Sequence, residues 1–377
     1  MKKIFLIRGI APDAYGGAES YQLQLAKILR KNGFEPIIVT PSKKLIELSS
    51  EEKILTIEAP YNKMQNWSGW RNILLPIYVI WQIKLIKWYK KQIKKYNPDI
   101  INIQSRDEWI AATIAGKKAK IKILWTDHAD FRSWVLKNIK KTGKNIIGKK
   151  IARLMKVPEK IIMISDYEAE SLRKTLYPKK IKNLIIIKNG AIDDLKKYKE
   201  IKSKPNSFCY VGRITNEKGI GELLDAFRIV HTKKQEVKLE LYGDGMHLQK
   251  YKKLAATDKN IIFHGYVKNT LENLAKSDIF ILPSHKEGLS LALAEAAMME
   301  KTIIATNVGG CSEIIINGKT GLLIPAQNTK KMAEAMLRVI ENRELAHKLA
   351  KNVRKHYENN FNFEKNIKEK LLPILNN

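Results

Sequence analysis

Cysteine and long apolar runs are both scarce in this sequence of 377 residues. Its two cysteines, Cys209 and Cys311, lie far apart. They form neither a disulfide framework nor the spaced pairs of a zinc site, and they are typical of a reducing compartment. Near the N-terminus the apolar stretch is only IFLI, which Arg8 ends. This stretch is too short for a secretory signal, so we expect a cytoplasmic protein that begins with a buried β-strand.

Several well-known functional signatures are also missing. The sequence has no P-loop, no Ser/His/Asp arrangement and no cluster of zinc ligands. The adjacent glycines Gly16 and Gly17 are not part of a G-x-G-x-x-G pattern, which argues against a nicotinamide-dependent dehydrogenase.

Acidic residues are few relative to basic ones. The chain has 69 Lys and Arg against 38 Asp and Glu, a formal net charge of +31. The excess is uneven, with 41 basic against 19 acidic residues in 1–200, and 28 against 19 in 201–377. A basic first half suits nucleic acid, an anionic membrane surface or a phosphorylated acceptor. A general compositional bias toward Lys and Ile explains the same charge, so both interpretations stay open.

The segment 72–95 is the one part of the chain that raises the question of a membrane. Residues 72–83 are uncharged, and six lysines follow in 84–95. Twelve residues cannot cross a bilayer, which takes roughly 20. The segment is either a helix lying in the plane of an anionic membrane surface or an ordinary packing helix with a solvated lysine face.

Short, nearly all-apolar segments alternate with helical patterns in both halves of the chain. This alternation predicts two doubly wound, Rossmann-like α/β domains facing an interdomain cleft, with a charged linker at 194–206. The expected strands are 3–7, 34–40, 99–104, 121–127, 160–165 and 183–190, then 207–212, 237–243, 260–267, 278–284 and 302–307. The clearest expected helices are 18–32, 219–232, 289–300 and 328–345.

Candidate phosphate-binding residues follow two expected strands. Gly212 and Arg213 end the strand 207–212, and Lys218 opens the next helix. Two cations beside a helix N-terminus suit a diphosphate. Gly16 and Gly17 stand before the first helix, where the backbone can also approach a phosphate closely.

Two glutamates stand out in the stretch SHKEGLSLALAEAAMM. Glu287 lies on the loop after the strand 278–284, and Ser290 is the expected N-cap of the following helix. The backbone amides of Gly288, Leu289, Ser290 and Leu291 then suit a phosphate or a sugar hydroxyl. Glu295 lies in a helix that is apolar on all sides, so we expect it to be buried. A ribose diol would give its carboxylate two donors, and a salt bridge to a nearby lysine is the alternative.

Three further candidates occupy strand ends. Gly243 ends the strand 237–243 in a tight turn, and Val267 stands at the end of the strand 260–267, where backbone groups suit the edge of a base. His128 follows the strand 121–127. All three are placed on the side of their sheets that faces the expected cleft.

In order along the chain, these motifs resemble the retaining glycosyltransferases of family 4, also called group 1 glycosyltransferases, which have the GT-B fold. The resemblance spans nearly the whole chain. It is carried by residues 16–19, by GRITNEKG (212–219), YGDG (242–245) and HGYV (264–267), by EGLSLALAE (287–295) and by residues 308–325.

The resemblance implies an acceptor-side domain at 1–200, a nucleotide-sugar-binding domain at 201–357 and a C-terminal helix at 358–377 that crosses back to the first domain. In it, Arg213 and Lys218 hold the diphosphate, Glu287 the donor sugar, and Glu295 the ribose. Val267 meets the base, His128 the reacting face of the sugar, and Gly17 the phosphates. No metal is expected. A uridine donor is common in the family.

The expected function is therefore transfer of a hexosyl or N-acetylhexosaminyl group to a glycan or lipid-linked acceptor in surface polysaccharide or glycolipid synthesis. It would take place in the cytoplasm, with peripheral contact to the inner face of the membrane as an additional hypothesis. Two alternatives remain: another GT-B enzyme, such as a sugar-nucleotide epimerase, and a non-catalytic nucleic-acid-binding protein, which no recognisable binding module supports.

Overall fold

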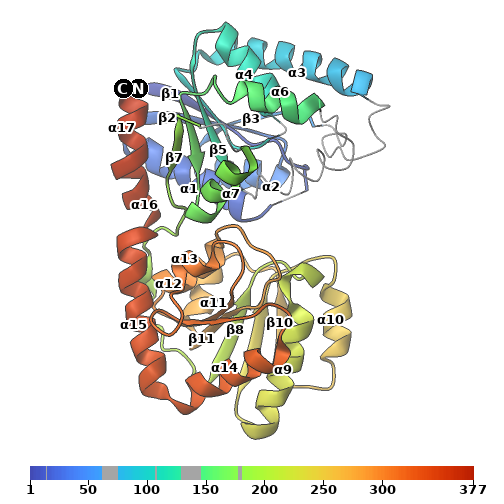
Figure 1. The fold of residues 1–377 in the computed structure, drawn as a ribbon, viewed down its shortest axis with the longest axis vertical. Helices are drawn as coiled ribbons and strands as arrows, with labels where there is room; N and C mark the ends of the chain where they lie inside the picture. Colours follow the sequence, from blue (N-terminus) through green and yellow to red (C-terminus); the bar gives the residue numbers. More distant parts are fainter. Residues whose placement is uncertain (14, 62–74, 107, 129–145, 177–180) are drawn as a thin grey trace. The chain divides into compact units, whose positions relative to one another are not determined.

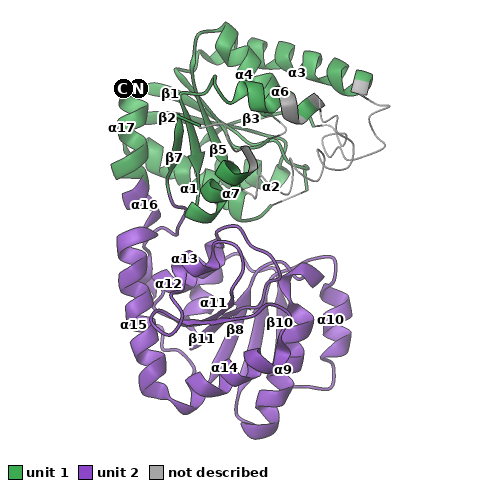
Figure 2. Cartoon of the chain, in the orientation of Figure 1, with its two compact units in different colours: residues 1–187, 367–377 green, residues 188–366 purple. Residues whose placement is uncertain are grey.

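The computed structural model describes residues 1–377 except 14, 62–74, 107, 129–145 and 177–180 (Figure 1). The chain forms two compact units, one of residues 1–187 and 367–377 and the other of residues 188–366 (Figure 2). The first unit therefore ends before the expected linker. The boundary lies there because the residues after 187 already bond to the second unit. For example, the carbonyl of Ala191 accepts a hydrogen bond from the backbone N–H of Phe363 (3.0 Å).

The first unit is built on a seven-stranded parallel sheet with the order β3-β2-β1-β4-β5-β6-β7. The strands are β1 (Lys2–Ile7), β2 (Phe34–Thr40), β3 (Leu55–Glu58), β4 (Ile100–Ile103), β5 (Lys122–Asp127), β6 (Lys160–Met163) and β7 (Leu184–Ile186).

Helices cover both faces of this sheet, as its nearly all-apolar strands require. Figure 1 shows α3, α4 and α6 on one face and α1, α2 and α7 on the other. Their bounds are α1 (Gly17–Lys31), α2 (Lys43–Glu51), α3 (Leu75–Tyr96), α4 (Trp109–Lys118), α6 (Ile146–Leu154) and α7 (Asp166–Leu176). In the core between α4 and the sheet, Trp109 stacks on Trp125 with ring centroids 4.5 Å apart.

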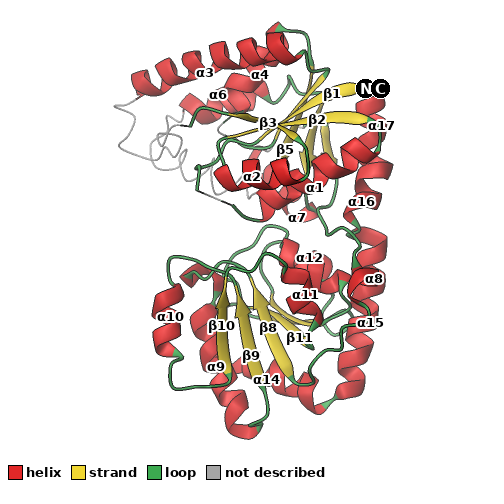
Figure 3. Ribbon diagram, turned by 180° about the vertical axis from the view of Figure 1, so that it is seen from behind, coloured by secondary structure: helices red, strands yellow, loops and turns green. Residues whose placement is uncertain are grey.

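The second unit contains a six-stranded parallel sheet with the order β10-β9-β8-β11-β12-β13. Helices again lie on both sides of the strands (Figure 3). The strands are β8 (Ser207–Val211), β9 (Lys238–Tyr242), β10 (Ile261–Gly265), β11 (Ile279–Leu282), β12 (Thr302–Thr306) and β13 (Leu322–Ile324). The helices are α8 (Leu195–Tyr198), the 3₁₀ turn η3 (Asn216–Lys218), α9 (Ile220–Lys233), α10 (Leu248–Leu254), α11 (Thr270–Ala275), α12 (Leu291–Met298), α13 (Cys311–Ile314), α14 (Thr329–Glu341), α15 (Arg343–Asn360) and α16 (Phe363–Asn366).

The prediction of two doubly wound α/β domains is confirmed, with corrections of detail. The short strands β3 and β13 were not predicted. The helix expected at 328–345 is wrong, because it breaks at Asn342, whose side chain accepts a hydrogen bond from the N–H of Leu345 (2.8 Å) and caps α15.

The C-terminal segment returns to the first unit through a change of helix type. A π-helical turn (Ile367–Leu371) follows α16 and leads into α17 (Leu372–Asn376). Pro373 stands in the first turn of α17, where its missing N–H leaves no intrahelical bond unmade. Lys2 donates to the carbonyl oxygens of Leu375 (3.0 Å) and Asn376 (2.8 Å) and so satisfies the end of this helix. Within the part of the chain described, no helix is both long and apolar enough to cross a bilayer.

Candidate functional site

The strand order of the second unit reverses between β8 and β11. In open parallel sheets, ligands bind outside the carboxyl ends of the strands at such a reversal. The loop after β8 carries Gly212, Arg213 and Lys218, and the loop after β11 carries Glu287 and leads into α12. The structure thus brings the two sequence-distant groups of predicted residues to the same switch point.

Backbone hydrogen bonds join the ends of β8, β9 and β10. The N–H of Gly212 donates to the carbonyl of Tyr242 (3.0 Å), and the N–H of Gly243 donates to the carbonyl of Gly265 (2.8 Å). Gly243 has a φ of 141°, and a Cβ there would lie 1.9 Å from the carbonyl oxygen of Gly212. No other residue fits this position without separating the two loops. Val267 is half-buried on the loop that follows β10.

Arg213 and Lys218 have different surroundings. Arg213 is exposed, and its guanidinium group has no hydrogen-bond or ion-pair partner among the described residues. Lys218 is mostly covered, with 18% of its side chain exposed, and its Nζ lies 2.5 Å from Oε1 of Glu287. Gly219 permits this approach, because its left-handed backbone (φ 67°) lets η3 lie against Pro283, where a Cβ would come within 2.0 Å of the carbonyl oxygen.

Glu287 is held from two sides. Its Oε1 accepts hydrogen bonds from Lys218 and from the hydroxyl of Ser284 (2.7 Å), and 10% of its side chain is exposed. Behind it, a Cβ at Gly309 (φ 54°) would lie 1.9 Å from the carbonyl oxygen of Glu287, and the N–H of Gly310 donates to the carbonyl of Gly288 (2.8 Å). Ser284, Gly219, Gly309 and Gly310 were not among the predicted site residues, although the motifs containing the three glycines were recognised.

The N-terminus of α12 has a side-chain cap and several backbone amides that are not used in the described chain. Ser290 is its N-cap, as predicted, and the Ser290 hydroxyl accepts from the N–H of Leu293 (3.3 Å). Within the described chain, the amides of Gly288, Leu289, Ser290 and Leu291 donate to no acceptor. Unsatisfied amides at the positive end of a helix dipole form a site for an anion or for hydroxyl oxygens.

Glu295 departs from expectation in one respect. It is partly exposed rather than fully buried. Its carboxylate forms neither a hydrogen bond nor an ion pair with any described residue, so the alternative of a lysine salt bridge is wrong for this part of the chain. The surrounding apolar side chains raise its pKa from 4.5 to about 7 by desolvation. Among the described residues, nothing donates a hydrogen bond to this carboxylate.

In the first unit, Gly16 is the N-cap of α1 with extended backbone (φ −171°), and Gly17 is its first residue. His128 directly follows β5, and its ring meets that of Tyr21 edge-on with centroids 4.6 Å apart. Its Nε2 is buried without a partner among the described residues.

Burial, with Arg8 and Arg106 nearby, lowers the pKa of His128 well below 6.5, so the imidazole is neutral. Arg8 pairs with Glu19 (2.8 Å), and Arg106 pairs with Asp127 (2.7 Å). The sequence interpretation did not include these two arginines, although each follows a strand, β1 or β4, at the reversal of the first sheet.

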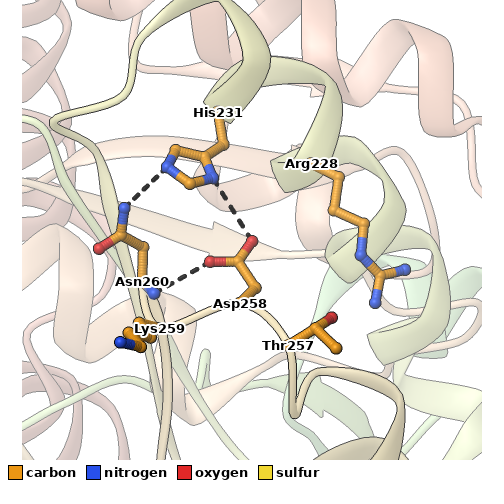
Figure 4. Close-up of a pocket in the computed structure, with 6 residues that line it drawn as sticks. All are labelled: Arg228, His231, Thr257, Asp258, Lys259 and Asn260. Atoms are coloured by element: carbon orange, nitrogen blue, oxygen red, sulfur yellow. Dashed lines mark hydrogen bonds and ion pairs between the residues drawn. The ribbon is translucent and has the colours of Figure 1, made fainter.

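A pocket of about 360 Å³ in the second unit is separate from these residues (Figure 4). It lies between the C-terminal end of α9 and the residues before β10, at the edge of the sheet opposite the carboxyl ends of the strands. Its polar groups satisfy one another: His231 contacts Asp258 (3.5 Å) and Asn260 (2.7 Å). Its lining residues are Arg228, His231, Thr257, Asp258, Lys259 and Asn260, none of them a predicted site residue. Nowhere in the described ranges do three or more His, Cys, Asp or Glu side chains form a group that could hold a metal ion.

Two Rossmann-like α/β units in one chain are the architecture of the GT-B fold, and at the switch point of the second unit neither Arg213 nor the first amides of α12 have a partner among the described residues. Comparison with known proteins identifies the family. The model for Glycosyltransferase Family 4 matches residues 15–194, and the model for Glycosyl transferases group 1 matches residues 191–356. The chain belongs to the group 1 glycosyltransferases.

Similar proteins agree with this assignment. An uncharacterized glycosyltransferase of Methanocaldococcus jannaschii is 25% identical over 396 residues, which cover 98% of this chain and 97% of that protein. The capsular polysaccharide biosynthesis glycosyltransferase CapM of Staphylococcus aureus is 31% identical over 159 residues, covering 40% of this chain and 41% of CapM. The crystal structure of Anabaena HepE in complex with UDP has a TM-score of 0.76 at 16% identity, covering 100% of each chain, and shows the shared fold.

Proposed function

We propose that this chain is a retaining glycosyltransferase that transfers a hexosyl or N-acetylhexosaminyl group from a UDP-sugar to a glycan or lipid-linked acceptor. The product would be a surface polysaccharide or glycolipid, as the name of CapM suggests for that relative. The UDP bound by HepE supports the choice of nucleotide. We further propose that it works in the cytoplasm, without a metal ion and without binding nucleic acid.

One observation carries the proposal. At the β8–β11 switch point, the guanidinium of Arg213 and the four amides of Gly288 to Leu291 all lack a partner among the residues that the structure describes. A diphosphate would take up both sets of donors, since phosphate oxygens bind guanidinium groups and helix N-termini. The carboxylate of Glu295 on the same helix would then accept hydrogen bonds from the ribose hydroxyls.

Lys218 and Glu287 form an ion pair with each other in this structure. We propose that donor binding exchanges these partners, so that Lys218 contacts the diphosphate and Glu287 accepts hydrogen bonds from the sugar hydroxyls. Ser284 would keep Glu287 in place during the exchange, because its hydroxyl holds the same carboxylate oxygen.

In the proposed transfer, the bond between the sugar C1 and the diphosphate oxygen breaks while the acceptor hydroxyl attacks C1 on the same face. The acceptor proton passes to the departing phosphate oxygen, and UDP leaves. Arg213 and Lys218 stabilise the charge that develops on that oxygen. Stabilisation of developing charge is usually the largest single contribution to catalysis. His128, kept neutral, is the residue that the resemblance assigns to the reacting sugar, and Gly16 and Gly17 would leave room for the phosphates.

Calorimetric titration with UDP tests the donor site. Arg213→Ala should weaken UDP binding by about tenfold to a hundredfold, which is the range for hydrogen bonds to charged groups. Arg338→Ala, which removes an exposed arginine of α14 with no partner among the described residues, is the matched control and should bind UDP normally. Equal affinity of the two variants would contradict the assignment.

Product analysis tests the reaction. With a panel of UDP-, GDP- and ADP-sugars, product should form only when a separate acceptor is present, and with the anomeric configuration of the donor. Conversion of the donor without an acceptor would instead indicate the epimerase alternative.

A further inference from the structure

Helix α3 is fixed in the first unit by one of its faces. Tyr78, Leu85, Tyr89 and Ile93 recur at helical spacing on this face and are all buried. The hydroxyl of Tyr89 donates a hydrogen bond to buried Glu108 (2.7 Å). These contacts determine which side of α3 faces the solvent.

The solvent side of α3 begins with apolar residues. Ile77, Val79, Ile80 and Ile83 are exposed by 47%, 48%, 54% and 48% of their surface. Other large exposed apolar side chains in the described ranges are scattered singly along the chain. Soluble monomers rarely concentrate exposed apolar residues in this way without a partner.

The same side continues with lysines. Lys84, Lys87, Lys90, Lys91, Lys94 and Lys95 are all exposed, and α3 contains no acidic residue. At 100° per residue, these lysines occupy the same half of the helix circumference as the four apolar residues. We call the four apolar residues and the six lysines together the outer face of α3. It is apolar toward its N-terminal end and cationic toward its C-terminal end.

A groove of about 400 Å³ adjoins the cationic end of this face, between α3 and α4. Lys90, Lys94 and Lys118 line it around the apolar side chains of Ile93, Ala115 and Ile121. None of these three lysines has an ion-pair or hydrogen-bond partner among the residues that the structure describes. The groove therefore offers unpaired cations above an apolar floor.

We infer that the outer face of α3 docks this protein onto an anionic phospholipid bilayer. Ile77, Val79, Ile80 and Ile83 enter the boundary between headgroups and acyl chains, and the lysines bind headgroup phosphates, including one in the groove. Amphipathic helices with separate apolar and basic parts bind membranes in this way. Nucleic acid would use the lysines but leave the apolar end exposed, so the surface fits a bilayer better.

Co-sedimentation of the full chain with vesicles tests the inference. The protein should bind vesicles containing phosphatidylglycerol and not vesicles of phosphatidylcholine alone. Lys87→Gln/Lys91→Gln should lower the partition coefficient by about 25-fold, since each lysine near an anionic surface contributes about fivefold. Ile80→Ser/Ile83→Ser should also lower it, and this loss should persist at high salt, which screens charge but not apolar burial.

The matched control is Lys351→Gln/Lys355→Gln on α15, which removes two exposed lysines of the second unit and should leave binding unchanged. An equal loss in this control would show that only net charge matters and would overturn the inference, as would equal binding to both kinds of vesicle. Binding of duplex DNA through the α3 lysines, without vesicle binding, would overturn it in favour of nucleic acid. Circular dichroism confirms that each variant is folded. The assay contains no donor, so its outcome is independent of the proposed transfer activity.

Discussion

The charge state of Glu295 provides the most direct test of the proposed donor site. Its pKa rises from 4.5 to about 7 because apolar side chains desolvate the carboxylate, which has no partner in the described part of the chain. That difference corresponds to about 3 kcal/mol between the two protonation states. Because the side chain is partly open to solvent, we take about 1–2 kcal/mol as the expected cost of ionising it in the folded chain.

The sign of the effect follows from linkage. The folded chain holds this proton more tightly than the unfolded chain, so its stability falls as the pH rises from about 4.5 through about 7, and stays level above that. Glu295→Gln should therefore raise the free energy of unfolding by about 1–2 kcal/mol near pH 8 and have almost no effect near pH 4. Urea unfolding at the two pH values measures this difference.

UDP binding should depend on pH in the opposite direction, because it should be stronger when Glu295 is ionised. The ionised carboxylate accepts stronger hydrogen bonds from the ribose, so removing it should weaken UDP binding by about tenfold or more above pH 7, and by less at pH 5.5. The quantity to compare is the ratio of the dissociation constants of Glu295→Gln and wild type, because the titration of UDP itself cancels in the ratio.

Glu344→Gln, which neutralises an exposed carboxylate in the first turn of α15, is the control: it should bind UDP like wild type at both pH values, and it should lose less than about 1 kcal/mol of stability near pH 8, because its charge favours the helix N-terminus. A ratio that does not change with pH would refute the assignment of Glu295 to the ribose. A Glu295→Gln variant that is no more stable than wild type near pH 8 would refute the raised pKa on which the pH dependence rests.

Three further predictions concern the stability of the folded chain at Gly243, Ser290 and His128. Gly243→Ala should cost more than 2 kcal/mol in urea unfolding, because a Cβ there would collide with the carbonyl of Gly212, whereas Gly265→Ala, with φ 73° and open space, should cost about 1 kcal/mol; equal costs would contradict this reasoning. Ser290→Ala should cost about 1 kcal/mol and Ser290→Gly only a few tenths, and a neutral Ser290→Ala would mean that the N-cap does not stabilise α12. Below about pH 6.5, His128 binds a proton in the unfolded chain but stays neutral in the folded chain, so the free energy of unfolding should fall as the pH is lowered. His128→Gln should reduce that fall in unfolding curves measured across this range.

Much of the fold follows from local pattern alone. Nearly all-apolar segments such as FEPIIVT predicted buried parallel strands, and β2 spans these same residues, 34–40. Helix caps also depend only on nearby residues. Ser290 was predicted to cap a helix because its hydroxyl accepts a hydrogen bond from the N–H three residues later. The break at Asn342 was missed because apolar periodicity continues on both sides of it.

What the sequence by itself determined was the alternation of strands and helices, the position of most candidate residues in the loops after strands, and the family that these motifs indicate. Tertiary structure alone decided that β8 lies beside β11, that Lys218 meets Glu287 across 69 residues of sequence, and that Glu295 is partly exposed, with no partner in the described ranges. The physical reason is the distance along the sequence over which each interaction acts. Periodicity and capping depend on neighbours within a few residues, whereas the separation of two distant side chains depends on strand order and on how closely glycines such as Gly219 let their loops approach.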